Sequence, residues 1–169
     1  MAYADDARLV YYDVVGNSAA TLRQQLKSNG PLDHGKRFDA HATWHVTWTY
    51  TYASTGQGCA FTKLDTSLNG VIELPRWVDP GDAPASLKIK WERFLAALRV
   101  HEDGHYAHGV AARNEIETLG RSFQIPGSCS AMAKTFNDEA SAIVDKYAAM
   151  DRQYDHDTDH GKSQGATFP

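Results

Sequence analysis

The chain is organised around the stretch Arg99-Val100-His101-Glu102-Asp103-Gly104-His105, which sets two histidines four residues apart with a glutamate directly after the first. Residues four apart on an α-helix lie on one face, about one turn from each other, so both imidazoles can reach a single metal ion. This H-E-x-x-H spacing is typical of helices that bind zinc. Glu102 would then lie beside the ion, where its carboxylate can take a proton from water that the ion activates.

Apolar residues on both sides of this stretch continue the same face, which predicts one long helix from about Leu87 to Gly120. The face carries Trp91, Phe94, Leu95, Leu98, Ala112, Ile116 and Leu119. His101 and His105 thus replace apolar residues on a buried stripe, which is costly unless they are hydrogen-bonded or bound to metal. A pair of core histidines satisfied by side chains is the alternative. Gly104 costs ~1 kcal/mol relative to Ala inside a helix, which indicates that a substrate or another segment approaches closely there.

The rest of the sequence predicts an α+β fold in which a small, mostly antiparallel sheet packs on two long helices. We expect strands at 8–15, 37–53, 59–64 and 71–75, a turn at 65–70, a short helix at 19–28 and a second long helix from 131 to about 150. In the second strand, threonines alternate with apolar and aromatic residues, so the apolar face is predicted to be buried. His41 and His45 share the threonine face, and we interpret them as groove-lining or exposed residues rather than ligands.

Length and composition indicate a single globular domain over residues 1–169. The chain is 42% hydrophobic and 22% charged, and its net charge of -4 argues against a nucleic-acid partner. No apolar run approaches the ~20 residues of a membrane span. The N-terminal residues 1–6 lack the basic and apolar regions of a signal peptide. The protein is therefore either cytosolic or exported with its signal removed, and Met1 before a polar start fits the second case.

Two cysteines, Cys59 and Cys129, belong to no zinc-binding spacing and can pair only with each other. A disulfide between them would close a loop of about 70 residues, stabilise the fold by ~4 kcal/mol in the chain-entropy model and imply an oxidising compartment. Both lie beside glycines and small polar residues in expected turns, which favours the disulfide. Two buried free thiols are the alternative.

A catalytic zinc usually has three protein ligands, so the two histidines leave one to be identified. His108 lies on the same helix face but about 10 Å along the axis from His101, too far for one ion. Glutamates at 115, 117 and 139 are candidates too, although we interpret each as a surface helix charge. The tail 151–169 is rich in Asp, His and Gly, and it is either a solvated terminus or a segment that folds back to complete the site. Asp155 and His160 are its candidates.

Landmarks along nearly the whole chain resemble a known bacterial family. They are Tyr11-Tyr12, Gly30-Pro31, Thr43-Trp44, Trp48, Cys59, Leu74-Pro75, Trp91, the H-E-x-x-H stretch, Cys129, the tail Tyr154-Asp155-His156-Asp157-Thr158-Asp159-His160-Gly161 and Gly165-Ala166. This order is similar to the family catalogued as domain of unknown function 922, described as predicted secreted zinc-dependent proteases. The resemblance implies an exported, zincin-like metallopeptidase with paired cysteines. It also favours His160 as the third ligand, with the Tyr154 phenol stabilising the oxyanion of the reaction.

We therefore expect zinc-dependent hydrolysis of peptide bonds in a peptide or protein substrate, by a secreted or periplasmic protein. One Zn²⁺ ion is expected on His101, His105 and His160, with Glu102 as general base and acid and Tyr154 as a second catalytic residue. The alternatives are a secreted zinc-containing binding or assembly module without catalysis, and an amidase that acts on cell-wall peptides. A purely structural zinc needs no adjacent carboxylate that does not bind it, which favours an enzyme.

Overall fold

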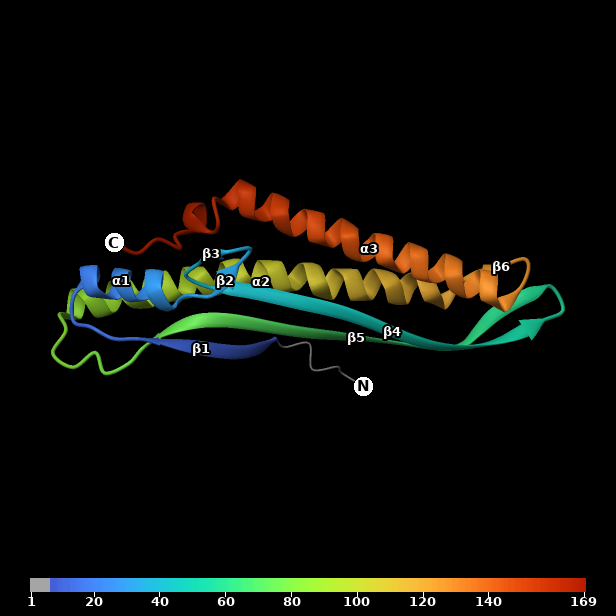
Figure 1. Ribbon diagram of the computed structural model, residues 1–169, viewed down its shortest axis with the longest axis horizontal. Helices are drawn as coiled ribbons and strands as arrows, with labels where there is room; N and C mark the ends of the chain where they lie inside the picture. Colours follow the sequence, from blue (N-terminus) through green and yellow to red (C-terminus); the bar gives the residue numbers. More distant parts are fainter. Residues whose placement is uncertain (1–6) are drawn as a thin grey trace. The chain divides into compact units, whose positions relative to one another are not determined.

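The computed structural model describes residues 7–169, which form three α-helices, a mixed sheet and several short elements (Figure 1). In chain order they are β1 (Arg8–Val14), α1 (Ala19–Asn29), β2 (Leu32–Asp33), β3 (Lys36–Arg37), β4 (His41–Thr55), β5 (Gly58–Trp77), α2 (Ala85–Arg121), β6 (Gln124–Ile125), α3 (Cys129–Thr158) and a 3₁₀ helix, η1 (Lys162–Gln164). The predicted α+β class is confirmed. The N-terminal stretch 1–6, interpreted above as lacking a signal peptide, lies outside the described residues. Within residues 7–169, no helix is both long enough and apolar enough to cross a bilayer.

The main sheet has the strand order β1-β5-β4, and the short strand β6 also pairs with β5. A two-residue turn joins β4 and β5 in a hairpin. Strand β6 is antiparallel to β5, with Cys59 opposite Ile125. Strand β1 instead runs parallel to the last part of β5, from the pair Arg8 and Val71 to the pair Val14 and Trp77. The sheet is therefore mixed at its β1 edge.

The turn predicted at 65–70 was wrong, because the strands predicted at 59–64 and 71–75 belong to one continuous strand, β5, from Gly58 to Trp77. The polar residues that suggested a turn, Asp65, Ser67 and Asn69, are all exposed, whereas Leu64, Thr66 and Leu68 between them are partly buried. This is the alternation of a strand with one solvated face. The polar residues belong to that face and do not interrupt the strand.

The described chain groups into two compact units. The first contains Trp44–Asn69 and Ala107–Asp151, and the second contains residues 7–43, Gly70–Tyr106 and Arg152–Pro169. Strands β4 and β5 and helices α2 and α3 each contribute residues to both units. A single domain over the whole chain stays a prediction.

The first unit has an apolar core between its helices and the hairpin. A cluster of buried residues forms it, comprising Val46, Ala112, Ile116, Phe136 and Ala140. The threonines of β4 face solvent, as the alternation predicted. Cys59 and Cys129 form a disulfide, so this prediction is confirmed and the alternative of two free thiols is wrong. The bond closes a loop over a sequence separation of 70 residues, for which the chain-entropy model gives ~4 kcal/mol.

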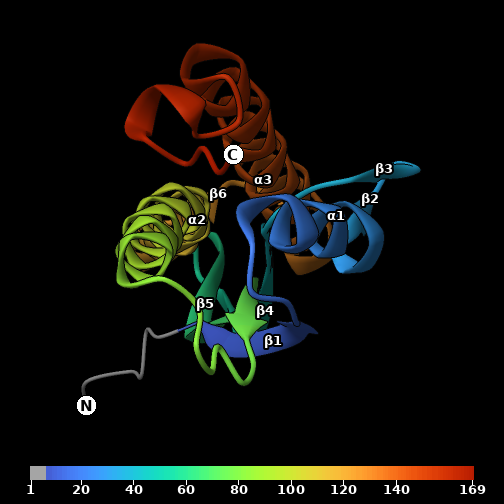
Figure 2. The same cartoon turned by 90° about the vertical axis from the view of Figure 1, so that its left-hand side faces the viewer.

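In the second unit, α1 and the first part of α2 lie on the same side of the sheet (Figure 2). Trp91 of α2 is at the centre of the aromatic contacts there, with ring centroids 5.7 Å from Trp77, 5.7 Å from Phe94 and 5.4 Å from Phe168. Edge-to-face contacts of this kind add to the gain from burying the rings. Phe168 therefore holds the C-terminal segment against α2.

Helix α3, which we predicted to end near Met150, continues to Thr158. The added turns carry Asp151, Tyr154, Asp155 and Thr158, which are spaced like the residues of one helix face. The prediction stopped too early because it followed apolar periodicity, and this face is polar.

Candidate metal centre

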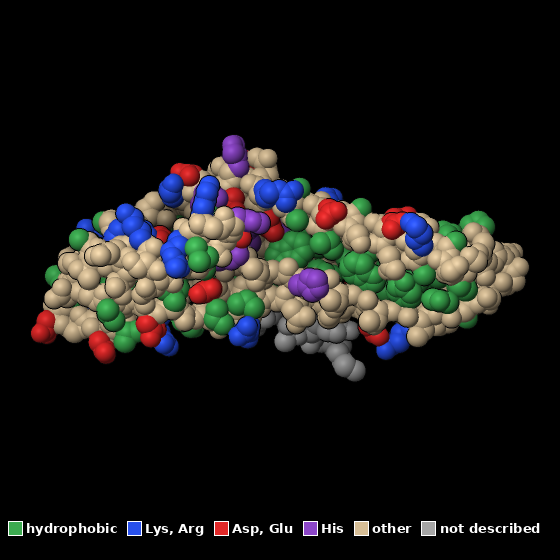
Figure 3. Space-filling model, in the orientation of Figure 1, with side chains coloured by type: hydrophobic (Ala, Val, Ile, Leu, Met, Phe, Trp, Pro, Cys, Tyr) green, Lys and Arg blue, Asp and Glu red, His purple; other side chains and the backbone are tan. Residues whose placement is uncertain are grey.

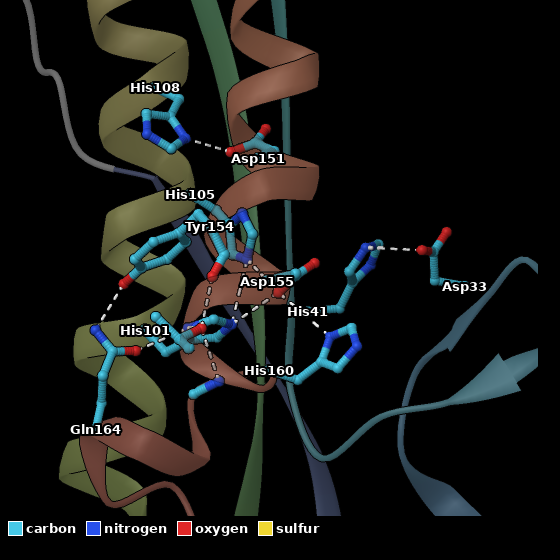
Figure 4. A network of polar contacts seen from close by, with 12 residues as sticks. Asp33, His41, His101, His105, His108, Asp151, Tyr154, Asp155, His160 and Gln164 are labelled. Atoms are coloured by element: carbon cyan, nitrogen blue, oxygen red, sulfur yellow. Dashed lines mark hydrogen bonds and ion pairs between the residues drawn. The ribbon is translucent and has the colours of Figure 1, made fainter.

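His101, His105 and Asp155 converge in the second unit (Figure 4). Both imidazoles come from α2 and are buried, with exposed fractions of 3% and 8%. Their Nε2 atoms are 3.2 Å apart, and Oδ1 of Asp155 lies 3.1 Å from that of His101 and 3.0 Å from that of His105. Burial acts to raise the pKa of Asp155, but the contacts with the two imidazoles outweigh it and hold that pKa well below its usual range. Asp155 is therefore a carboxylate.

These three donor atoms fit a zinc ion in both chemistry and spacing. Zinc in proteins binds imidazole nitrogen and carboxylate oxygen at ~2.1 Å in a tetrahedral arrangement, which sets ligand atoms about 3.4 Å apart. The three observed separations are within a few tenths of an ångström of that value. Two imidazoles and one carboxylate are also a donor set of catalytic zinc sites, where the fourth position stays open.

The second ring nitrogen of His101 has two partners that can only accept a hydrogen bond. Gln164 Oε1 lies 2.9 Å from Nδ1, while the Gln164 amide nitrogen donates to the Tyr154 hydroxyl. Thr158 Oγ1 lies 3.5 Å from Nδ1 and donates its own hydrogen to the Tyr154 carbonyl. Nδ1 therefore carries a proton, and Nε2 faces the Asp155 carboxylate. A ring nitrogen and a carboxylate oxygen 3.1 Å apart require either a proton or a metal cation between them.

Glu102 lies next to this group with an exposed fraction of only 4%. Burial raises its pKa from the ordinary value to about 7, against the lowering effect of His101 and His105; Asp155 raises it further, and a hydrogen bond from the backbone of Ala42 lowers it. A carboxyl group with a pKa near neutrality is suited to accept and return a proton.

The ring of Tyr154 forms one wall of the site. It stacks on His101 at 4.9 Å between ring centroids and meets His105 edge-on at 5.0 Å. Gly104 is the residue that leaves room for it: a Cβ atom there would lie 2.4 Å from the Tyr154 hydroxyl oxygen and 2.6 Å from Cζ. The segment whose close approach Gly104 indicated is thus the end of α3.

Gly104→Ala should destabilise the fold, although the same change inside an ordinary helix gains ~1 kcal/mol. The added methyl group must displace a ring that two imidazoles and Gln164 hold in place. Overpacking of this kind costs about 1–3 kcal/mol, so we expect a net loss measured by urea unfolding. In a Tyr154→Ala background the clash is gone, and Gly104→Ala should then stabilise the protein. An equal loss in both backgrounds would contradict this account.

A turn of left-handed residues follows α3, with φ of 48° at Asp159, 51° at His160 and 82° at Gly161. Residues other than glycine disfavour this left-handed backbone conformation, so contacts around Asp159 and His160 must stabilise it. The backbone N–H of His160 donates to the Asp155 carbonyl at 2.9 Å. A Cβ atom on Gly161 would lie 2.9 Å from Cγ of His101, so the turn rests on that imidazole.

His160, the predicted third ligand, contacts the group through Asp155. Its Nδ1 lies 3.3 Å from Asp155 Oδ1, its side chain is half exposed, and its ring packs against Phe38. Among the described residues, the ligand atoms of His101, His105 and Asp155 all lie within 4.8 Å of one another, and His160 is not in that group. The structure thus brings Asp155, one of the alternatives, closest to both imidazoles.

The remaining candidates from the sequence have protein partners or face solvent. In the first unit, His108 Nδ1 is 2.6 Å from Asp151, whose second oxygen accepts from the Trp44 indole. The other candidate glutamates are Glu115, which pairs with Lys146 and Tyr147, Glu117, which lies 4.0 Å from Arg121, and Glu139, which is exposed. In the second unit His41 lies 3.9 Å from Asp33, and in the first unit His45 of β4 is exposed.

Figure 3 shows histidine and acidic side chains gathered next to the carboxyl end of α3. No role was predicted for Thr158 or Gln164, which contact His101 from that end of the chain. Both belong to the ligand-rich tail, and Thr158 also lies in the tail motif that resembles the family.

A family model described as "Bacterial protein of unknown function (DUF922)" matches residues 9–161. No curated protein and no solved structure matches the chain.

Proposed function

Since this chain belongs to DUF922, a family of bacterial proteins of unknown function, we propose a function from its site. The proposed reaction is the hydrolysis of peptide bonds with a bound zinc ion, as in zincin-like metallopeptidases. One observation carries the proposal. A buried glutamate, Glu102, lies beside two imidazoles and a carboxylate whose donor atoms have the spacing of zinc ligands. A site that only stabilises the fold has no need of such a neighbour.

We assign His101, His105 and Asp155 as the ligands. A zinc ion bound there would supply Lewis-acid chemistry, which activates water and polarises the carbonyl of the scissile bond. His160, given as a ligand in the sequence prediction, is assigned instead to the support of Asp155, because that carboxylate oxygen is its nearest polar contact at the site.

The residues around the ligands supply the proton transfers. Glu102 takes a proton from the attacking water and passes it to the leaving amine, which is the work of a general base and then a general acid. The Tyr154 ring packs against both imidazoles, and we assign its hydroxyl as the donor to the oxygen that becomes negative. The disulfide supports an oxidising compartment, so we propose that the protein acts after export, as a secreted or periplasmic enzyme.

The test is zinc content together with hydrolysis of an unfolded protein substrate. We expect about one zinc ion per chain by elemental analysis after dialysis against trace zinc. A chelator should abolish hydrolysis, and added zinc should restore it. Purified peptidoglycan serves as the second substrate, since an amidase of cell-wall peptides would share this site. A protein that retains no zinc under these conditions would contradict the proposal. It would favour the alternative in which His101 and His105 are core histidines satisfied by side chains.

A further inference from the structure

We propose that Gln164 is a positioning residue that couples the ligand His101 to Tyr154, an inference that rests on the proposed function. Its amide oxygen lies 2.9 Å from His101 Nδ1, and its amide nitrogen donates to the Tyr154 hydroxyl at 2.9 Å. One side chain thus contacts a ligand and a candidate catalytic group through two different atoms (Figure 4).

The local backbone holds Gln164 in this position. It is the last residue of η1, which lies between Gly161 and Gly165, both in the left-handed region. The backbone N–H of Ala166 donates to the Gly161 carbonyl and closes the turn. Although Gln164 is exposed, its amide reaches a buried imidazole.

At His101, the amide oxygen of Gln164 accepts the Nδ1 hydrogen and so keeps the Nε2 lone pair on the ligand side. Loss of a partner behind a metal-binding histidine typically weakens metal affinity about 10–100-fold. The affinity for zinc should therefore depend on an acceptor at position 164.

At Tyr154, the amide N–H of Gln164 donates to the phenol oxygen. The phenol therefore cannot donate its own hydrogen to that amide nitrogen. A carboxylate at position 164 would reverse this contact, because it can only accept and would draw the Tyr154 hydrogen toward itself. Glutamine thus satisfies His101 and, unlike a carboxylate, does not draw the Tyr154 hydroxyl hydrogen toward position 164.

Two substitutions separate the two contacts. Gln164→Leu removes both, and we expect zinc affinity, measured by competition with a chromophoric chelator, to fall about 10–100-fold. The downfield imidazole N–H resonance of His101 in the zinc-loaded protein should weaken through exchange with water. Gln164→Glu keeps the acceptor, so affinity and resonance should stay close to wild type. Its hydrolysis rate should nevertheless fall about 10²-fold, the effect of losing one donor to the oxyanion.

Gln153→Leu is the matched control, because Gln153 is exposed on α3 and its amide contacts only Asp157 among the hydrogen bonds described. It should leave affinity, resonance and rate unchanged. Wild-type affinity and an unchanged resonance in Gln164→Leu would overturn the role at His101. Full activity in Gln164→Glu would overturn the role at Tyr154. A wild-type protein that binds no zinc at all would instead overturn the proposed function.

Discussion

Glu102→Gln should abolish most of the hydrolytic activity while leaving the zinc content unchanged. The carboxylate lies beside the proposed ligands and is not one of them, so the amide removes the proton acceptor without removing a bond to the ion. A positioned general base contributes about 10²–10⁴-fold to a rate, and we expect kcat to fall by that factor. Steady-state kinetics and elemental analysis on the same preparation would measure both quantities.

The amide has nearly the same shape as the carboxyl group, and its oxygen can still accept the hydrogen bond from the backbone of Ala42. The fold should therefore tolerate the change. Glu92→Gln is the matched control, because Glu92 is an exposed residue of the same helix, and it should keep both zinc and activity. If Glu102→Gln hydrolyses substrate at the wild-type rate, the carboxylate is not the base. If the wild type binds zinc but neither protein hydrolyses anything, the zinc-containing binding module becomes the better account.

The sequence predicted the elements whose signals are local. The apolar stripe of α2 and the alternation of β4 each follow from side-chain periodicity, and both elements occur where this periodicity places them. The turn predicted at 65–70 was wrong because polar residues on the solvated face of a long strand resemble a turn in composition. The parallel pairing of β1 with β5 depends on contacts between distant segments, which no local pattern contains.

The candidate site also combines residues found from local spacing with residues brought together only by the tertiary fold. His101, Glu102 and His105 were found because their spacing alone brings them to one helix face. The residues alone did not rank Asp155 and His160, and the family resemblance favoured His160. Both lie in the tail, and only the tertiary fold determines which of them lies near the imidazoles. The extension of α3 to Thr158 puts Asp155 on the helix, while His160 follows in the left-handed turn.

Asp155→Ala should lose zinc, whereas His160→Ala should retain most of it. Asp155 Oδ1 lies about 3 Å from both imidazole nitrogens, where a shared ion would need it. Removal of Asp155 takes away a bond to the ion and the only negatively charged ligand proposed for it. Loss of a residue behind a ligand can lower metal affinity roughly 100-fold, and we expect a larger loss here. His160 contacts Asp155 Oδ1 at 3.3 Å but is not grouped with the two imidazoles, so its removal should cost about tenfold or less.

Competition with a chelator on the two variants would measure the difference directly. Asp157→Ala is the matched control for the first substitution, because Asp157 is exposed on the same turn of α3 and should leave affinity unchanged. If His160→Ala loses zinc and Asp155→Ala keeps it, the ligand implied by the family resemblance is correct, and the turn at residues 159–161 must rearrange when the ion binds. If both lose it equally, Asp155 and His160 bind as a pair. Only the predicted order leaves Asp155 of α3 as the third ligand and His160 as its support.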